Sequence, residues 1–356
     1  MIEIITLEQE ARWIELVKSF QNYDVYYLPG YVKAFKLQGD GEPLLIYYNN
    51  QKLRGICVLM RRMINRKLVS QLAIGDMDLY DVVTPYGYGG FIFEGDVDLS
   101  EMKIFMEEYT SCMCEGGIVT GFFRFHPQLN NAIYFNEIAP VYDLGKTVEV
   151  ALTDKEDIFK NISSKNRNMI RKAIKLGVIV NHGQGKEILE KFKHMYDCTM
   201  EKRQARQYYF FDLKFYEALD NDLKDNYRVF YAEYDNKIIS AAIILFAGKR
   251  MHYHLSGSHT EYKHMASSNL LLYEAACWGA SQGLNTFHLG GGIGSCEDSL
   301  YKFKQSFNPK YSMIFSTSKQ VYDIGKYQQL TDIAVRKHGV DSEATFFPLY
   351  SLVQNI

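Results

Sequence analysis

The feature of the sequence that most restricts the fold is one succession of elements that occurs twice. In each half, two β-rich runs are separated by a short turn, and a longer helical pattern later leads into an apolar strand. In the first half we expect these elements at 44–48, 53–60, 100–116 and 118–125. In the second half we expect them at 227–234, 238–246, 267–283 and 286–289. The repeat predicts an α+β fold with mixed sheets, built from two similar units.

Capping signals support the two long helices. Each pattern begins near a serine, Ser100 or Ser267, whose hydroxyl can accept free backbone N–H groups. Each ends at a glycine, Gly116 or Gly283, which suits the left-handed conformation at a helix end. The two patterns have the same length, which favours a duplication.

The length of the chain indicates two domains. At 356 residues the chain exceeds what one core usually fills, so we expect two domains of roughly 150 to 200 residues each. We predict an acceptor-binding domain over 1–150 and a donor-binding domain over 151–356, with a helical segment over 154–176 at the junction. The pair Ser163 and Ser164 interrupts the apolar spacing of that segment. Further helices are expected at 8–19 and 186–206.

The junction segment carries a stripe of cations. Arg167, Arg171 and Lys175 are four residues apart and share one helix face, with Lys165 and Lys172 beside them. Such a stripe can bind phosphates. It is equally typical of a solvated helix face whose cations are favoured near the helix C-terminus by the macrodipole.

Composition narrows the class of protein. With 47% hydrophobic residues and a net charge of −2, the chain is typical of a globular protein and not of a globally basic nucleic-acid binder. The first residues lack the pattern of a secretory leader, and the apolar run 238–247 is too short to cross a bilayer, so we expect a cytoplasmic protein. The six cysteines are scattered, and Cys112 and Cys114 do not share a helix face, so no metal site is expected.

Three further segments are candidates for binding or chemistry. The glycines and tyrosines of 85–90 allow a ligand to approach the backbone closely, although a glycine-rich turn explains them as well. The run 252–258 ends a strand with polar side chains, where a sheet often opens to substrate. In 301–307 a lysine lies between phenylalanines, where it can meet a phosphate or carboxylate or simply be exposed.

Several common motifs are absent. The glycines of 290–294 are followed by Ser295 where the dinucleotide fingerprint needs its third glycine. The run 183–187 lacks the serine or threonine of a P-loop. The sequence has no G-x-S-x-G elbow, so a covalent nucleophile is not indicated.

Taken together, these segments resemble the FemAB family, the aminoacyl-tRNA-dependent transferases that add amino acids to the peptide of cell-wall precursors. The motifs that carry the resemblance are Tyr86–Gly90, Ser164–Arg167, Arg171–Ala173, Tyr253–Ser258, Ser268–Leu271, His288–Gly292 and Phe303–Phe307. The resemblance covers most of the chain. It implies two tandem GNAT-like domains in the arrangement of FemX, without a coiled-coil arm.

The resemblance also implies roles for particular residues. A lysine near the N-terminus, Lys36 or alternatively Lys33, would bind the precursor, together with Tyr88 and with an arginine and a tyrosine among Arg203, Arg206, Tyr208 and Tyr209. The pair Phe303 and Lys304 would meet the acyl donor. One position departs from the family, because Phe93 stands where some members carry a carboxylate, with Glu94 next to it.

These considerations give a set of candidate residues. The candidate catalytic residues are Tyr88, Lys304, Tyr253 and Glu94. The candidate substrate-binding residues are Lys36, Tyr86, Arg203, Arg206, Tyr208, His254, Ser258, Asn269 and Phe303. The candidate phosphate ligands are Arg167, Arg171 and Lys172. No metal and no resident cofactor are expected.

The predicted reaction is attack by an acceptor amine on an activated ester or thioester, without an acyl-enzyme. A clean Arg/Gln-x-x-Gly-x-Gly/Ala loop for the pyrophosphate of coenzyme A is not visible, which favours aminoacyl-tRNA as donor. The family resemblance implies a peptidoglycan precursor as acceptor. A CoA-dependent N-acyltransferase is the alternative. A non-catalytic protein that binds a cell-wall or glycan ligand is a third interpretation, and peripheral contact with a membrane is compatible with each.

Overall fold

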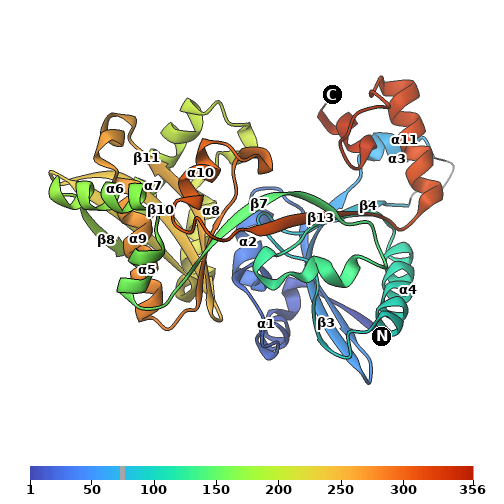
Figure 1. Cartoon of the computed structure of the whole chain (residues 1–356). Coiled ribbons are helices and arrows are strands. Elements are labelled where there is room, and N and C mark those ends of the chain that lie inside the picture. The colour runs from blue at the N-terminus through green and yellow to red at the C-terminus, as the bar shows by residue number, and fades with distance from the viewer. Residues whose placement is uncertain (73–76, 356) are drawn as a thin grey trace. The chain divides into compact units, whose positions relative to one another are not determined.

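The computed structural model describes residues 1–72 and 77–355, which form two units with the same order of strands (Figure 1). The first unit comprises Met1–Phe20, Gly39–Asp143 and Ser316–Ile356. The second comprises Gln21–Gln38 and Leu144–Phe315. Neither unit is one continuous stretch of chain. The predicted domains 1–150 and 151–356, with their acceptor and donor roles, stay a prediction.

The sheet of the first unit has the order β1-β2-β3-β4-β6-β13. Its strands are β1 (Ile2–Ile5), β2 (Glu42–Asn49), β3 (Leu53–Met63), β4 (Tyr80–Val83), β6 (Ile118–Arg124) and β13 (Met313–Val321). All neighbours are antiparallel except β4 and β6, which are parallel. The short strand β5 (Ile92–Gly95) pairs with β3.

The sheet of the second unit repeats this pattern in the order β8-β9-β10-β11-β12-β7. Its strands are β8 (Ile179–Gly183), β9 (Tyr227–Tyr234), β10 (Lys237–Ala247), β11 (Arg250–Ser258), β12 (Thr286–Gly290) and β7 (Tyr142–Ala151). Only β11 and β12 are parallel neighbours. The predicted duplication of the α+β unit is therefore confirmed.

The last strand of each sheet comes from the other half of the succession. Strand β7 follows β6 along the chain but pairs with β12, where Val150 lies opposite Phe287. Strand β13 follows β12 along the chain but pairs with β6, where Ser318 lies opposite Phe123. Each sheet is thus completed by a strand that follows the strands of the other sheet along the chain.

Helices cover both faces of the second sheet (Figure 1). They are α2 (Pro29–Leu37), α5 (Lys155–Asn161), α6 (Ser164–Lys175), α7 (Lys186–Lys202), α8 (Leu213–Asp222), α9 (Ser267–Ser281) and α10 (Ser299–Gln305). Helix α7 packs on β9, β10 and β11 and carries α8, which in turn contacts α2. Helix α9 packs on the sheet with α5 and α6 over it, and its buried Leu271 and Ala275 belong to the same apolar core as Phe287 of β12.

The described apolar side chains of the first unit gather in two cores. Its helices are α1 (Glu10–Ser19), α3 (Arg66–Val69), α4 (Leu99–Glu115) and α11 (Ile324–His338). Helix α4 buries Phe105 and Tyr109 in one core with strands β2, β3 and β6. Helix α11 lies beside α3 (Figure 1) and buries Leu330 in the second core, together with Tyr350 of the C-terminal 3-10 segment Leu349–Asn355.

The predicted caps of the long helices are partly wrong. The side chain of Asp98, and not that of Ser100, accepts the first N–H groups of α4. Helix α9 starts after Ala266, and no side chain caps it. Gly283 has the expected left-handed backbone with φ +72°, whereas Gly116 has φ −74° and the next residue, Gly117, takes φ +69°. The interruption predicted in 154–176 is confirmed between α5 and α6, where the hydroxyl of Ser163 accepts the Asn166 N–H.

Among residues 1–72 and 77–355, every helix is too short or too polar to cross a membrane.

Candidate active site

The two parallel strands of the second unit separate toward their carboxyl ends. Strands β11 and β12 pair only from Arg250 with Thr286 to His252 with His288. Beyond this point β11 continues to Ser258 beside β10, whereas β12 ends at Gly290 beside β7. A separation of this kind exposes backbone groups of both strands, and ligands of open sheets bind at such carboxyl ends.

Lys304 lies at this separation. The residue belongs to α10, which follows β12, and its Nζ donates a hydrogen bond of 2.7 Å to the carbonyl oxygen of Gly291. The same nitrogen is 5.7 Å from the centre of the Tyr253 ring on β11. The side chain of Lys304 therefore lies close to both strands where they separate. Lys304 and Tyr253 are both in the candidate catalytic set from the sequence.

The ammonium group of Lys304 has an unusual environment. Only 8% of the residue is exposed. The pKa of Lys304 is lowered from 10.5 to about 8, chiefly by burial, with the carboxylate of Asp298 acting to raise it and the positive charge of Arg203 acting to lower it. A lysine with this pKa can exchange a proton near neutral pH, which is what acid-base catalysis requires.

Arg203 is brought to the site by the packing of α7 on β11. It is the residue that ends α7, and its charge also acts on the phenol of Tyr253. The hydroxyl of Thr199, one turn earlier, accepts the N–H of Ser258 at 3.1 Å. This bond fixes the end of β11 to the end of α7. The candidate residues Arg203, Tyr253, Ser258 and Lys304 consequently lie in one region of the second unit.

Asn166 is a buried residue that was not among the candidates. Its side chain donates to the Ser306 hydroxyl and accepts from the amide of Asn269, each at 2.8 Å. Three of the motifs behind the family resemblance, on α6, α9 and α10, meet at these hydrogen bonds. Asn166 is only 2% exposed, and its place inside one motif was its only signal in the sequence. The candidate residues Asn269 and Phe303 are held in this junction, and Phe303 packs against the core of the second unit.

Lys36 and the loop after α7 lie in the same unit. Lys36 is exposed on α2, and Gln38, two residues on, donates from its side chain to the carbonyl oxygen of Tyr208 at 3.1 Å. Lys33, the alternative candidate, forms an ion pair with Asp222 of α8 at 2.8 Å. The structure thus joins the end of α2 to the loop that holds the candidates Arg206 and Tyr208.

His254 lies next to aromatic rings of α2. Its ring centre is 5.7 Å from that of Tyr31 and 6.2 Å from that of Phe35. Burial, with a smaller effect of His252, lowers the pKa of His254 to about 3. The imidazole is therefore neutral at physiological pH. It can take part in hydrogen bonding but not in charge attraction to a substrate.

The candidates Tyr86 and Tyr88 belong to a rigid loop of the first unit. Asn131 donates to the carbonyl oxygens of Gly89 at 2.9 Å and Phe91 at 3.0 Å, and Arg124 donates to that of Pro85 at 3.1 Å. A Cβ atom on Gly90, whose φ is +88°, would lie 2.8 Å from a ring carbon of Phe125. The loop is thus held from several sides.

Both tyrosines of this loop are partly buried. The Tyr88 ring lies 5.9 Å from that of His126, and burial raises the pKa of the Tyr88 phenol, so this hydroxyl stays protonated. A protonated phenol in a fixed loop can donate a hydrogen bond to a substrate.

Glu94 forms an ion pair with Arg54, within the paired strands β5 and β3. Arg54 also donates to the carbonyl oxygen of Ser19 and lies over the ring of Phe20 at 4.4 Å. Phe93, the neighbour of Glu94, is buried in the core of the first unit. The role of Glu94 as a catalytic residue stays a prediction.

The three candidate phosphate ligands on α6 differ in their surroundings. Arg167 donates to the carbonyl oxygens of Lys160 at 2.9 Å and Ile162 at 2.5 Å and thereby braces the corner between α5 and α6. The guanidinium of Arg171 lies 5.1 Å from the centre of the Phe159 ring. Lys172 is exposed.

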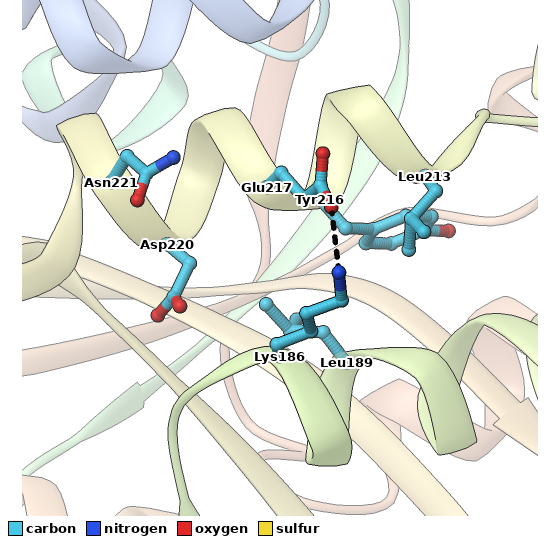
Figure 2. Close-up of a pocket in the computed structure, with 7 residues that line it drawn as sticks. All are labelled: Lys186, Leu189, Leu213, Tyr216, Glu217, Asp220 and Asn221. Atoms are coloured by element: carbon cyan, nitrogen blue, oxygen red, sulfur yellow. Dashed lines mark ion pairs between the residues drawn. The ribbon is translucent and has the colours of Figure 1, made fainter.

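A pocket of about 170 Å³ lies elsewhere in the second unit, between α7 and α8 (Figure 2). Its charged side chains are paired within the protein, because Lys186 contacts Glu217 at 3.3 Å and Asp220 accepts from the Tyr227 hydroxyl at 2.5 Å. Its lining residues are Lys186, Leu189, Leu213, Tyr216, Glu217, Asp220 and Asn221. None of the candidate site residues is among them.

Comparison with known proteins defines the class. Residues 161–304, which contain Lys304, Arg203 and Tyr253, match the acetyltransferase (GNAT) domain family. No curated protein matches the chain in sequence. The GNAT match covers the sheet from β8 to β12 and helices α6 to α9, so the strand separation described above belongs to a GNAT domain.

The fold of the whole chain is that of FemX. The crystal structure of FemX superimposes with a TM-score of 0.67 at 13% identity, over 92% of this chain and 99% of that one. The C-terminal domain of an Agrobacterium fabrum protein described as a lysylphosphatidylglycerol synthetase gives 0.54 at 13% identity, over 91% and 98%. A protein of unknown function from Bacteroides thetaiotaomicron VPI-5482 gives 0.55 at 10% identity, over 90% and 100%. At these identities the likeness establishes a shared fold.

The chain is FemAB-like in fold, and its GNAT domain makes it an acyltransferase. The predicted fold class and the predicted class of enzyme are confirmed. The transferred group, the donor and the acceptor belong to the proposal that follows.

Proposed function

We propose that the protein transfers an aminoacyl group from aminoacyl-tRNA to an amine of a peptidoglycan-precursor-like acceptor. The observation that carries this proposal is the meeting of Lys304, Arg203 and Tyr253 where β11 and β12 separate. The acceptor nitrogen attacks the ester carbonyl carbon of the donor there, and the ester C–O bond then breaks to release the tRNA hydroxyl.

Lys304 supplies a place for the proton in this scheme. In its neutral form the amine takes the proton from the attacking nitrogen and then gives it to the departing ribose oxygen. Arg203 and the hydroxyl of Tyr253 would stabilise the negative charge that forms on the carbonyl oxygen. Holding the two reactants in contact contributes the larger share of the rate, as in other transfers without a covalent intermediate.

The donor proposal is supported by the start of α9. A helix N-terminus that no side chain caps can bind a phosphate with its free N–H groups, and α9 begins in this way at Ala266. The segment ahead of it, Thr260–Met265, is a 3-10 helix and has none of the glycines with which a pyrophosphate loop approaches CoA. This favours a tRNA donor.

A CoA-dependent N-acyltransferase is the second candidate. The match of residues 161–304 to an acetyltransferase family supports it, because the family is described by acetyl transfer. In this reaction a thioester replaces the ester, and Lys304 has the same function.

One experiment separates the two candidates. The protein is incubated with a UDP-linked muramyl peptide, in one tube with a mixture of charged tRNAs and in the other with acyl-CoAs, and the peptide is examined by mass spectrometry. An added aminoacyl mass in the first tube alone supports the proposal. An acyl mass in the second tube alone assigns the CoA reaction, and unchanged peptide in both tubes contradicts the proposed acceptor.

A further inference from the structure

The turn between α6 and β8 carries a cluster of exposed aliphatic side chains. Ile174 is 55%, Leu176 is 39% and Ile179 is 63% exposed, all within one stretch of six residues. Single exposed apolar residues are ordinary on a protein surface, whereas a contiguous group indicates an interaction site. Gly177 makes the turn with φ +83°, and the buried Val178 anchors it to the core.

Positive charge surrounds this turn. Residues 158–186 contain seven lysines and arginines and no aspartate or glutamate, although the whole chain has a net charge of −2. Lys165, Lys172 and Lys175 are exposed, and within the described part of the chain none of them forms an ion pair. A carboxylate does approach from the neighbouring strand, where Glu233 lies opposite Ile179 and accepts from the amide of Asn181.

The helix geometry places the cations and the aliphatic groups side by side. Ile170 and Ala173 of α6 face the core, so Lys172 and Lys175 project from the outer surface. At 100° per residue, Ile174 lies to one side of this cationic stripe and Leu176 to the other. The end of α6 and the turn therefore present exposed aliphatic side chains beside the two lysines of this stripe.

We infer that the surface formed by Lys172, Ile174, Lys175, Leu176 and Ile179 docks on an anionic lipid bilayer. Lysines near such a bilayer are attracted by its phosphates, by about fivefold in affinity for each charge. The aliphatic side chains gain by entering the acyl boundary. An RNA backbone also attracts the lysines, but it offers no apolar phase for the two isoleucines. The aliphatic cluster therefore favours lipid over RNA.

The test is co-sedimentation of the full chain with vesicles of phosphatidylcholine that contain phosphatidylglycerol, and with vesicles of phosphatidylcholine alone. We expect binding to the anionic vesicles only, with a strong decrease at high salt. The double variant Lys172→Glu/Lys175→Glu should bind at least about 25-fold more weakly, and Ile174→Ser/Ile179→Ser at least about tenfold more weakly.

Matched controls come from α11 of the first unit. Ile324 is also 63% exposed, and Lys337 is exposed, so Ile324→Ser and Lys337→Glu should bind vesicles as the unmodified protein does. Equal sedimentation with both kinds of vesicle, or none with either, would overturn the inference. Full binding of the isoleucine variant to anionic vesicles would also overturn it. The same holds if the protein binds uncharged tRNA but no vesicles, and if the lysine variant loses this tRNA binding. This test needs no transferase activity, so its outcome is independent of the proposed reaction.

Discussion

At the scale of single residues, the candidate site around Lys304 depends on residues that are close in space and on the side chain that caps α10. Asp298 accepts the N–H of Tyr301 at 2.9 Å and so starts α10, the helix that carries Lys304. A Cβ atom on Gly292 would lie 2.4 Å from the same carboxylate, which shows how tightly the glycine loop is folded around it. Asp298 is therefore a positioning residue for Lys304, and its charge opposes the effect of burial on the Lys304 pKa.

The first prediction concerns Asp298→Asn. Asparagine keeps an oxygen that can cap α10 but removes the negative charge, so the pKa of Lys304 should fall below about 8. If neutral Lys304 takes the proton, turnover rises with pH and levels off above this pKa, and the variant should reach its plateau at lower pH. The measurement is the pH profile of kcat, together with the shift of the Lys304 side-chain signal in NMR spectra.

The control for this prediction is Asp212→Asn, which alters the cap of α8 in the same unit. Its pH profile should match that of the unmodified enzyme. A profile that is unchanged in Asp298→Asn, or one that moves to higher pH, contradicts the assigned positions of the charge and the proton.

At this scale the sequence supplied candidate residues but not their protonation state. Lys304 and Tyr253 were selected because they lie in motifs with a recognisable order. Asn166 was not, because a buried hydrogen bond between α6, α9 and α10 leaves no pattern along the chain. The lowered pKa of Lys304 likewise depends on burial, which only the folded chain defines.

At the scale of elements, local patterns predicted the hairpins and long helices of the repeated succession, because periodicity and turn residues act over a few positions. They did not predict β7, β13 or α11. The caps were less predictable. Asp98 and Ser100 both stand at the start of α4, and the carboxylate of Asp98 accepts both the Ser100 N–H and the Ser100 hydroxyl. When two side chains in one turn can accept hydrogen bonds, the sequence alone does not show which of them accepts the backbone N–H groups.

The C-terminal 3-10 segment gives the prediction at this scale. Tyr350 and Thr120 donate hydrogen bonds from their hydroxyls to the buried carboxylate of Asp81, and burial raises the pKa of Asp81 to about 6. Because this folded pKa lies above the usual 3.8, the charged form destabilises the fold. The stability of the first unit should therefore rise as pH falls through 6, and the gain should be complete near pH 4.

Asp81→Asn isolates this contribution. The variant should be more stable than the unmodified protein at pH 8, by up to about 3 kcal/mol, and equally stable near pH 4. Urea unfolding at the two pH values measures the difference. A variant that is destabilised by the same amount at both would show that Asp81 acts through its hydrogen bonds and not through its charge.

At the scale of the whole molecule, the duplication was visible in the sequence but the membership of strands was not. The order of elements repeats locally, whereas the pairing of β7 with β12 and of β13 with β6 joins residues more than a hundred positions apart. Residues 21–38 likewise pack in the second unit, where Asp24 pairs with Arg250 at 3.1 Å. Nothing in the composition of these segments marks the unit to which they belong.

This arrangement predicts the behaviour of the two halves. A fragment of residues 151–356 lacks nearly all of β7 and the segment 21–38, and a fragment of 1–150 lacks β13. Each should fail to give a cooperative thermal transition alone, whereas the two expressed together should copurify and unfold cooperatively. Circular dichroism melts test this. A sharp transition of either fragment on its own contradicts the assigned strand membership.

The most direct test of the account is the single-turnover rate of transfer by Lys304→Ala compared with Lys302→Ala. Both lysines lie on α10, but Lys302 is exposed whereas Lys304 is buried against Gly291 and Tyr253. We expect Lys304→Ala to lose about 100-fold or more in rate with an unchanged melting temperature, as loss of an acid-base group does, and Lys302→Ala to retain the full rate. Equal rates for the two variants would contradict the placement of the chemistry at the separation of β11 and β12.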